Sequence, residues 1–210
     1  MNPSLVGSEM CIRDSPDGLG GPELMDRMRQ QSINCGTKIE TETITAVDLS
    51  KRPFTVTSES GKVVEAETLI ISTGAIAKRL GIKGEDVFWQ KGMSACAVCD
   101  GALPIFRDKV LVVVGGGDSA MEEATFLTKF ASKVLLVHRR DSFRASKSMQ
   151  KRVLENAKIE VHWNSAVIEA KGENLMNSVI IQNLETKAEV EHQANGLFYA
   201  IGHTLSLIHI

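Results

Sequence analysis

The segment that decides the fold is Val110-Leu111-Val112-Val113-Val114-Gly115-Gly116-Gly117-Asp118-Ser119-Ala120. Its five consecutive apolar residues predict a strand that is buried on both faces, as in a parallel sheet. Apolar residues recur at helical spacing over 118–130, and residues 134–137 are again wholly apolar. This order of strand, glycine turn, helix and strand predicts a βαβ unit in an α/β fold with a parallel sheet.

The glycine turn matches the dinucleotide-binding pattern G-x-G-x-x-G/A. Gly115 serves the tight turn, Gly117 lets the backbone approach a ligand, and Ala120 stands where the helix packs on the strand. Such a turn receives a pyrophosphate on backbone N–H groups at the start of a helix. We therefore expect a dinucleotide here, with an ordinary glycine-rich βα turn as the alternative.

The residues after the second strand indicate which dinucleotide it is. An NAD site usually carries an acidic residue there, but this chain continues His138-Arg139-Arg140-Asp141-Ser142-Phe143-Arg144. Arginines present planar donor forks that suit a phosphate dianion. The cluster favours NADPH, and a solvated basic loop is the alternative.

Two cysteines shortly before this unit have the spacing of a redox pair. Cys96 and Cys99 are separated by two residues and can close a small disulfide ring. A zinc site is not expected, because CxxC supplies only two of four ligands and the histidines are scattered. Four cysteines in all do not make a secreted disulfide framework, so we expect a reducing, cytoplasmic compartment. Cys35 is expected to be a small core residue.

Composition excludes several classes of function. The 210 residues are 43% hydrophobic and carry a net charge of −2, so no global field favours nucleic acid or an anionic membrane. No apolar run approaches the roughly 20 residues that span a bilayer, which predicts a soluble protein.

The chain is expected to contain parts of two domains. Residues 1–15 and 205–210 resemble read-through from sequence assembly and are expected to be non-native, with a real disordered N-terminus and a real terminal strand as the alternative. Residues 16–77 are expected to form part of a first domain, 78–201 a nucleotide domain with the CxxC pair, and 202–204 the start of a return crossing. The expected elements are a helix over 21–30, strands over 44–49, 54–57 and 67–74, a linker over 81–92, a helix over 148–156, and strands over 159–163, 166–170, 179–181 and 196–202.

Three blocks together resemble one family. They are SACAVCDG (94–101), GGGDSAMEEA (115–124) and HRRDSFRA (138–145). In this order they resemble the low-molecular-weight NADPH-dependent thioredoxin reductases of plants and bacteria, over residues 18–203. The resemblance implies two Rossmann-like domains of the pyridine nucleotide-disulfide oxidoreductase type. An FAD domain is interrupted by an inserted NADPH domain, and the intact protein is a homodimer.

The resemblance also implies a mechanism. Electrons pass from NADPH through FAD to the Cys96–Cys99 disulfide and then to thioredoxin. In the family pattern Cys99 lies nearer the flavin, Cys96 attacks thioredoxin, and Asp100 is the acid that handles the proton. The cofactor contacts carried over are Gly115, Gly117, Asp118, Ser119 and Ala120 for the dinucleotide, His138, Arg139, Arg140 and Arg144 for the 2′-phosphate, and Thr73 and Gly74 for FAD.

The chain departs from the family at both ends. The first glycine-rich FAD loop and the segment that closes over the flavin are absent, so the fragment itself is expected to bind NADPH at best and to be inactive. Two alternatives stay open. Instead of a thioredoxin reductase, the parent protein could be the flavoprotein reductase partner of a peroxiredoxin. It could also be a non-catalytic NADP-binding, redox-sensing module.

Overall fold

The computed structural model describes residues 19–205, so the expectations for residues 1–15 and for the tail beyond 205 lie outside that range. The chain divides into two compact units, one over Ala77–Gly202 and the other over Leu19–Ile76 with residues 203–205. No helix between residues 19 and 205 is long and apolar enough to cross a membrane.

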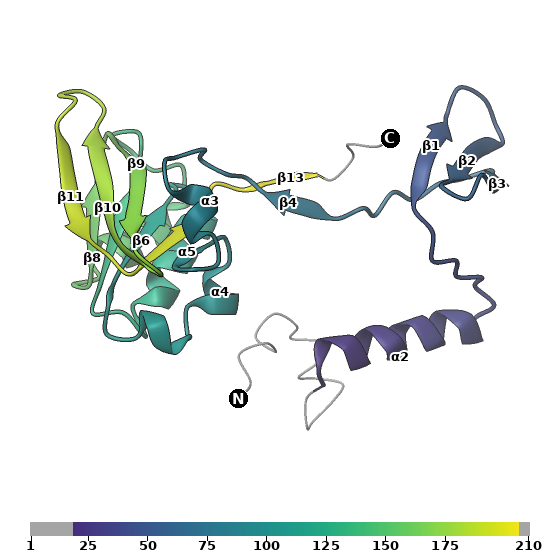
Figure 1. Cartoon of the computed structure of the whole chain (residues 1–210), viewed down its shortest axis with the longest axis horizontal. Helices are drawn as coiled ribbons and strands as arrows, with labels where there is room; N and C mark the ends of the chain where they lie inside the picture. Colours follow the sequence, from purple (N-terminus) through teal and green to yellow (C-terminus); the bar gives the residue numbers. More distant parts are fainter. Residues whose placement is uncertain (1–18, 206–210) are drawn as a thin grey trace. The chain divides into compact units, whose positions relative to one another are not determined.

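The first unit is built on a five-stranded parallel sheet (Figure 1). Its strands, in spatial order, are β5 (Met93–Ser94), β12 (Gly196–Tyr199), β6 (Val110–Val114), β7 (Lys133–Val137) and β8 (Ile159–His162). The expected α/β fold with a parallel sheet is confirmed, because β6, α5 (Asp118–Leu127) and β7 form a βαβ unit.

Central strand β6 has no solvent-facing side. Leu111, Val112 and Val113 are fully buried, and they alternate between two cores. Leu111 and Val113 pack with helices α5 and α6 (Lys147–Leu154), whereas Val112 packs with an antiparallel sheet. The result is three layers: helices, a parallel sheet, and a second sheet.

The second sheet is three-stranded and runs in the order β11–β10–β9. Its strands are β9 (Ser165–Gly172), β10 (Met176–Asn183) and β11 (Glu189–Gln193). The sequence predicted parts of β9 and β10 but missed β11, whose residues are mostly exposed and polar. Met176, Val179 and Ile181 of β10 are buried against the parallel sheet, so this sheet closes the second core.

The segment expected to be a linker over 81–92 is instead packed, and that prediction was wrong. It contains helix α3 (Glu85–Phe88), in which Phe88 belongs to the second core and Glu85 is buried. The glycines and charges that suggested a loop have other roles. Gly84 is the N-cap of α3, and Glu85 is part of a buried polar network.

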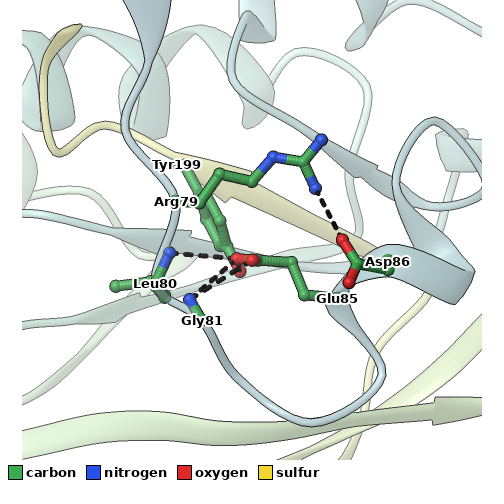
Figure 2. A network of polar contacts seen from close by, with 6 residues as sticks. All are labelled: Arg79, Leu80, Gly81, Glu85, Asp86 and Tyr199. Carbon is green, nitrogen blue, oxygen red and sulfur yellow. Dashed lines mark hydrogen bonds and ion pairs between the residues drawn. The ribbon is translucent and has the colours of Figure 1, made fainter. Parts of the chain in front are cut away.

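That network surrounds the Glu85 carboxylate (Figure 2). It accepts hydrogen bonds from the Tyr199 hydroxyl at 2.7 Å, the Leu80 N–H at 2.9 Å and the Gly81 N–H at 3.2 Å. Burial, together with the adjacent Glu85, raises the pKa of Tyr199, which keeps the phenol protonated as a donor. Three donors offset the cost of burying the charge, and they fasten residues 80–81 to strand β12.

The described residues of the second unit form one helix and two small sheets, which Figure 1 shows. Its elements are α2 (Gly21–Asn34), the antiparallel strands β1 (Ile44–Asp48), β2 (Phe54–Ser58) and β3 (Val63–Ala66), and the pair β4 (Ala75–Ala77) and β13 (His203–Leu205). The predicted helix over 21–30 and the strands near 44–49 and 54–57 are confirmed.

Two predictions for the second unit were wrong. Residues 67–74 form no strand, and Ile70 is 89% exposed, because no described segment pairs with this run or covers it. Cys35 is an exposed free thiol at the end of α2 rather than a core residue. Both errors arise from reading an apolar or small residue as buried when no described element packs on it.

We expect Glu85→Gln to lower the free energy of unfolding by about 2 kcal/mol, because a neutral amide loses charge-assisted hydrogen bonds from three donors. Urea denaturation of the full chain measures the change. Asp86→Asn on the same helix is the matched control: Asp86 is fully exposed and pairs only with Arg79 at 3.5 Å, so its loss should change stability by less than about 0.5 kcal/mol. Equal effects of the two substitutions would contradict the anchoring role of Glu85.

Candidate functional site

The two cysteines of the CxxC motif form a disulfide. The Cys96 and Cys99 sulfur atoms are 1.99 Å apart at the start of helix α4 (Ala97–Asp100). Cys96 is the N-cap in extended conformation, and the Cys99 N–H points to its sulfur at 3.2 Å. Cys99 is exposed and Cys96 is half-buried, so the ring lies at the surface where a partner thiol can reach it.

Asp100 is joined to the same ring by a buried serine. The Ser94 hydroxyl donates to the Asp100 carboxylate at 2.6 Å and accepts from the Cys96 N–H at 3.0 Å. Ser94 is 6% exposed and comes from strand β5, next to β12 in the sheet. Ser94 was not predicted as a site residue, because its contact with Asp100 depends on where β5 ends relative to α4.

Glu123 is a second carboxyl group close to this helix. It lies on α5, which packs against α4, and its Oε2 atom is buried with no hydrogen-bond partner among the described residues. Burial raises the pKa of Glu123 to about 7; the Ala97 backbone amide opposes this and neighbouring Glu122 adds to it. The sequence gives no sign of this, since a glutamate within a helix is ordinarily solvated.

The glycine loop connects β6 to α5 and has one enclosed and one open side. A Cβ at Gly115 would meet the Ala200 carbonyl at 2.5 Å, whereas one at Gly117 would meet nothing within 4 Å. Gly117 therefore leaves the backbone of the α5 N-terminus accessible, which a pyrophosphate requires. Ala120 is fully buried against the strand, as the pattern requires. Ser119 is exposed at the start of the helix.

The arginine segment lies beside this loop. The Arg144 N–H donates to the Gly116 carbonyl at 2.8 Å, and the Ser146 N–H donates to the Asp118 carboxylate at 2.8 Å. Arg139, Arg140 and Arg144 are all exposed. Because β6 and β7 are parallel neighbours, the turns that follow them lie at one sheet edge, where open-sheet proteins bind nucleotides.

His138 differs from the three arginines. Its ring is 7% exposed, its Nε2–H donates to the Ser142 carbonyl at 3.0 Å, and its Cε1 atom is 2.1 Å from where a Cβ on Gly116 would stand. Burial lowers the pKa of His138, with further lowering by Arg140 and Arg139. The side chain thus spaces the glycine loop from the arginine segment, and its position is not that of a free cation.

The expected FAD contacts lie in irregular, exposed chain. Thr73 and Gly74 belong to residues 67–74, and no flavin cradle forms around them among the described residues. Nor do residues 19–205 place three or more His, Cys, Asp and Glu side chains together to bind a metal ion. The glycine loop and the arginine segment fit NADPH, whereas the described residues around Thr73 and Gly74 form no flavin site.

Comparisons with known proteins point in one direction. Residues 10–207 match the pyridine nucleotide-disulphide oxidoreductase family. The chain is 61% identical over 191 residues to "Thioredoxin reductase" of Dictyostelium discoideum and 55% identical over 193 residues to "Thioredoxin reductase, mitochondrial" of Kluyveromyces lactis. In each comparison 90% of the chain is covered, but only 60% and 55% of the relative.

A solved structure agrees with these matches. "Thioredoxin reductase from Giardia duodenalis" superposes with a TM-score of 0.70 at 45% identity, covering 89% of this chain and 60% of that one. The chain thus spans between about half and two thirds of the length of the proteins it resembles.

We expect Gly116→Ala to lower the free energy of unfolding by about 1–3 kcal/mol, because the added methyl group overlaps the buried His138 ring. Thermal or urea denaturation measures this. Gly117→Ala is the matched control: its Cβ enters open space, so only the N-cap preference changes, by less than about 1 kcal/mol. A larger loss at Gly117 than at Gly116 would contradict the close contact between Gly116 and His138.

Proposed function

Because the chain belongs to the pyridine nucleotide-disulphide oxidoreductase family, we propose that the intact protein is an NADPH-dependent thioredoxin-disulfide reductase. The observation that carries this is one compact unit, Ala77–Gly202, holding both an exposed Cys96–Cys99 disulfide and a glycine loop flanked by arginines. Its relatives are named thioredoxin reductases. Neither a peroxiredoxin partner nor a non-catalytic sensor gains support from these comparisons.

In this proposal NADPH supplies the hydride when it is bound. The loop residues Gly115, Gly117 and Ala120, together with Asp118 and Ser119 at the N-terminus of α5, would hold its pyrophosphate. Arg139, Arg140 and Arg144 bind the 2′-phosphate through charge-assisted hydrogen bonds. His138, which the family pattern adds to this clamp, is buried and fills the space between the two loops.

The disulfide is the electron acceptor. Two electrons and two protons break the Cys96–Cys99 bond and leave two thiols, one of which ionises to the reactive thiolate. Cys96 attacks the disulfide of thioredoxin, and Cys99 then attacks the mixed disulfide, which re-forms the ring and releases reduced thioredoxin. Asp100, held by Ser94 two residues before Cys96, donates and accepts the proton in these exchanges.

The rest of the assignment concerns the intact protein. In the intact protein Thr73 and Gly74 would be among the residues that hold FAD, which would supply the electron transfer between NADPH and the disulfide. The unit Leu19–Ile76 is part of the FAD domain, Ala77–Gly202 is the inserted NADPH domain, and the intact protein is a homodimer. The crossings near Ala75 and Gly202 are the hinge between them. We assign the protein to the reducing cytoplasm; some of its relatives are named mitochondrial.

Replacing Arg139 and Arg140 together by Ala should weaken NADPH binding about 10- to 100-fold, because two charge-assisted contacts to the 2′-phosphate are lost. NADH, which lacks that phosphate, should bind within about twofold of its original affinity. Calorimetric titration of the chain with each nucleotide measures both. Arg152→Ala, on the exposed face of α6, is the control with unchanged affinities. Equal losses for NADPH and NADH would contradict the phosphate clamp.

In the intact protein Cys99→Ser should abolish NADPH-dependent reduction of thioredoxin. The remaining Cys96 thiol should instead accumulate a mixed disulfide with oxidised thioredoxin, because the resolving sulfur is gone. Turnover assays and non-reducing gels follow the two outcomes. Cys35→Ser is the control, since that thiol is exposed and outside the disulfide. Continued turnover in Cys99→Ser would overturn the proposed reductase mechanism.

A further inference from the structure

Glu123 occupies a position between the two parts of the proposed site. Its helix, α5, starts at the nucleotide loop and packs along α4, which carries the disulfide. The two helices approach closely, because a Cβ at Gly101 would lie 2.5 Å from the Leu127 side chain. Ala97, the residue after Cys96, is fully buried in the same core as Ala120 and Ala124. Glu123 thus lies beside the first turn of α4.

The Glu123 carboxyl group lacks a full set of hydrogen-bond partners among the described residues. Its Oε2 atom is buried and unpaired among the described residues, and the amide of Ala97 is the group that partly stabilises its charge. A buried acceptor without a partner is costly, and the cost falls when the carboxyl is protonated.

We propose that Glu123 is a positioning residue that controls the ionisation of the cysteine thiols after the Cys96–Cys99 bond has been reduced. Charged Glu123 opposes thiolate formation next to the Ala97 amide, and neutral Glu123 permits it. The inference rests on the proposed function only in taking the reduced pair as a working state.

The direction of the effect follows from like charges in a partly dry site. Two like charges raise each other's pKa, and at an effective dielectric of about 20 a pair about 10 Å apart does so by about one unit. Because the pKa of Glu123 is raised to about 7, the carboxyl changes charge in the pH range where the thiols act. Glu122 is an exposed neighbour of Glu123 on α5 that raises the Glu123 pKa, and Asp100 is the acidic residue of α4, beside the two cysteines. The thiols and Glu123 therefore titrate as a coupled set.

The test uses the full 210-residue chain, reduced with a water-soluble phosphine, and follows thiolate absorbance at 240 nm from pH 5 to 10. Subtracting the oxidised chain isolates Cys96 and Cys99, since the other two cysteines contribute to both titrations. Glu123→Gln should lower the thiolate midpoint by about one pH unit. Glu122→Gln removes the same charge from an exposed neighbour and should shift it by less than a third of that. An unchanged midpoint in Glu123→Gln, or equal shifts in both variants, overturns the proposal.

A second measurement needs no substitution. Coupling is reciprocal, so the carboxyl carbon resonance of Glu123 in the unaltered chain should titrate at higher pH in the reduced form than in the oxidised form. An identical midpoint in the two forms overturns the proposal, even where Glu123→Gln fails to fold. Neither experiment uses NADPH, FAD or thioredoxin, so a failure of the reductase assignment is seen separately in the turnover and nucleotide-binding assays.

Discussion

Burial of strand β6 on both faces is the constraint on which the first unit depends. Leu111 and Val113 face one core and Val112 faces the other, so each side of the sheet requires its own cover. Helix α5 and its neighbour supply one cover, and strands β9 and β10 supply the other. A strand enclosed in this way cannot slip in register without exposing apolar groups, so the turn at its end is held at a defined place. The position of the glycine loop that follows β6 is therefore fixed by this packing.

The glycine loop and the arginine segment, which form the proposed nucleotide site, contact each other directly. The Gly116 carbonyl receives the Arg144 N–H, and the His138 ring fills the space that a larger residue at 116 would occupy. Such contacts fix the backbone of the arginine segment relative to the helix N-terminus, so that this part of the geometry is already set when a ligand binds. The middle glycine of the loop is therefore constrained by sterics, although the binding pattern treats it as free.

The periodicity of apolar residues predicted those elements whose formation depends on residues nearby in the sequence. The βαβ unit and the glycine turn followed from residues 110–137, because a wholly apolar strand and a 3.6-residue repeat are legible in one segment. The buried strand at 67–74 failed because a strand needs a partner, and no described segment supplies one. Three further features could not be predicted, because each depends on a segment that is distant in sequence. They are the burial of His138, the hydrogen bonds of Ser94 and the raised pKa of Glu123.

The first unit also closes on itself where the chain enters and leaves. The Lys78 N–H donates to the Gly202 carbonyl at 3.0 Å, and Glu85 fastens the next residues to the strand that ends at Tyr199. A body of more than a hundred residues thus has its two ends side by side. Domains with adjoining ends can be inserted into a host loop without stretching it, since closing that loop costs little entropy. Because its ends adjoin, this unit also suits insertion into a loop of another protein and circular permutation.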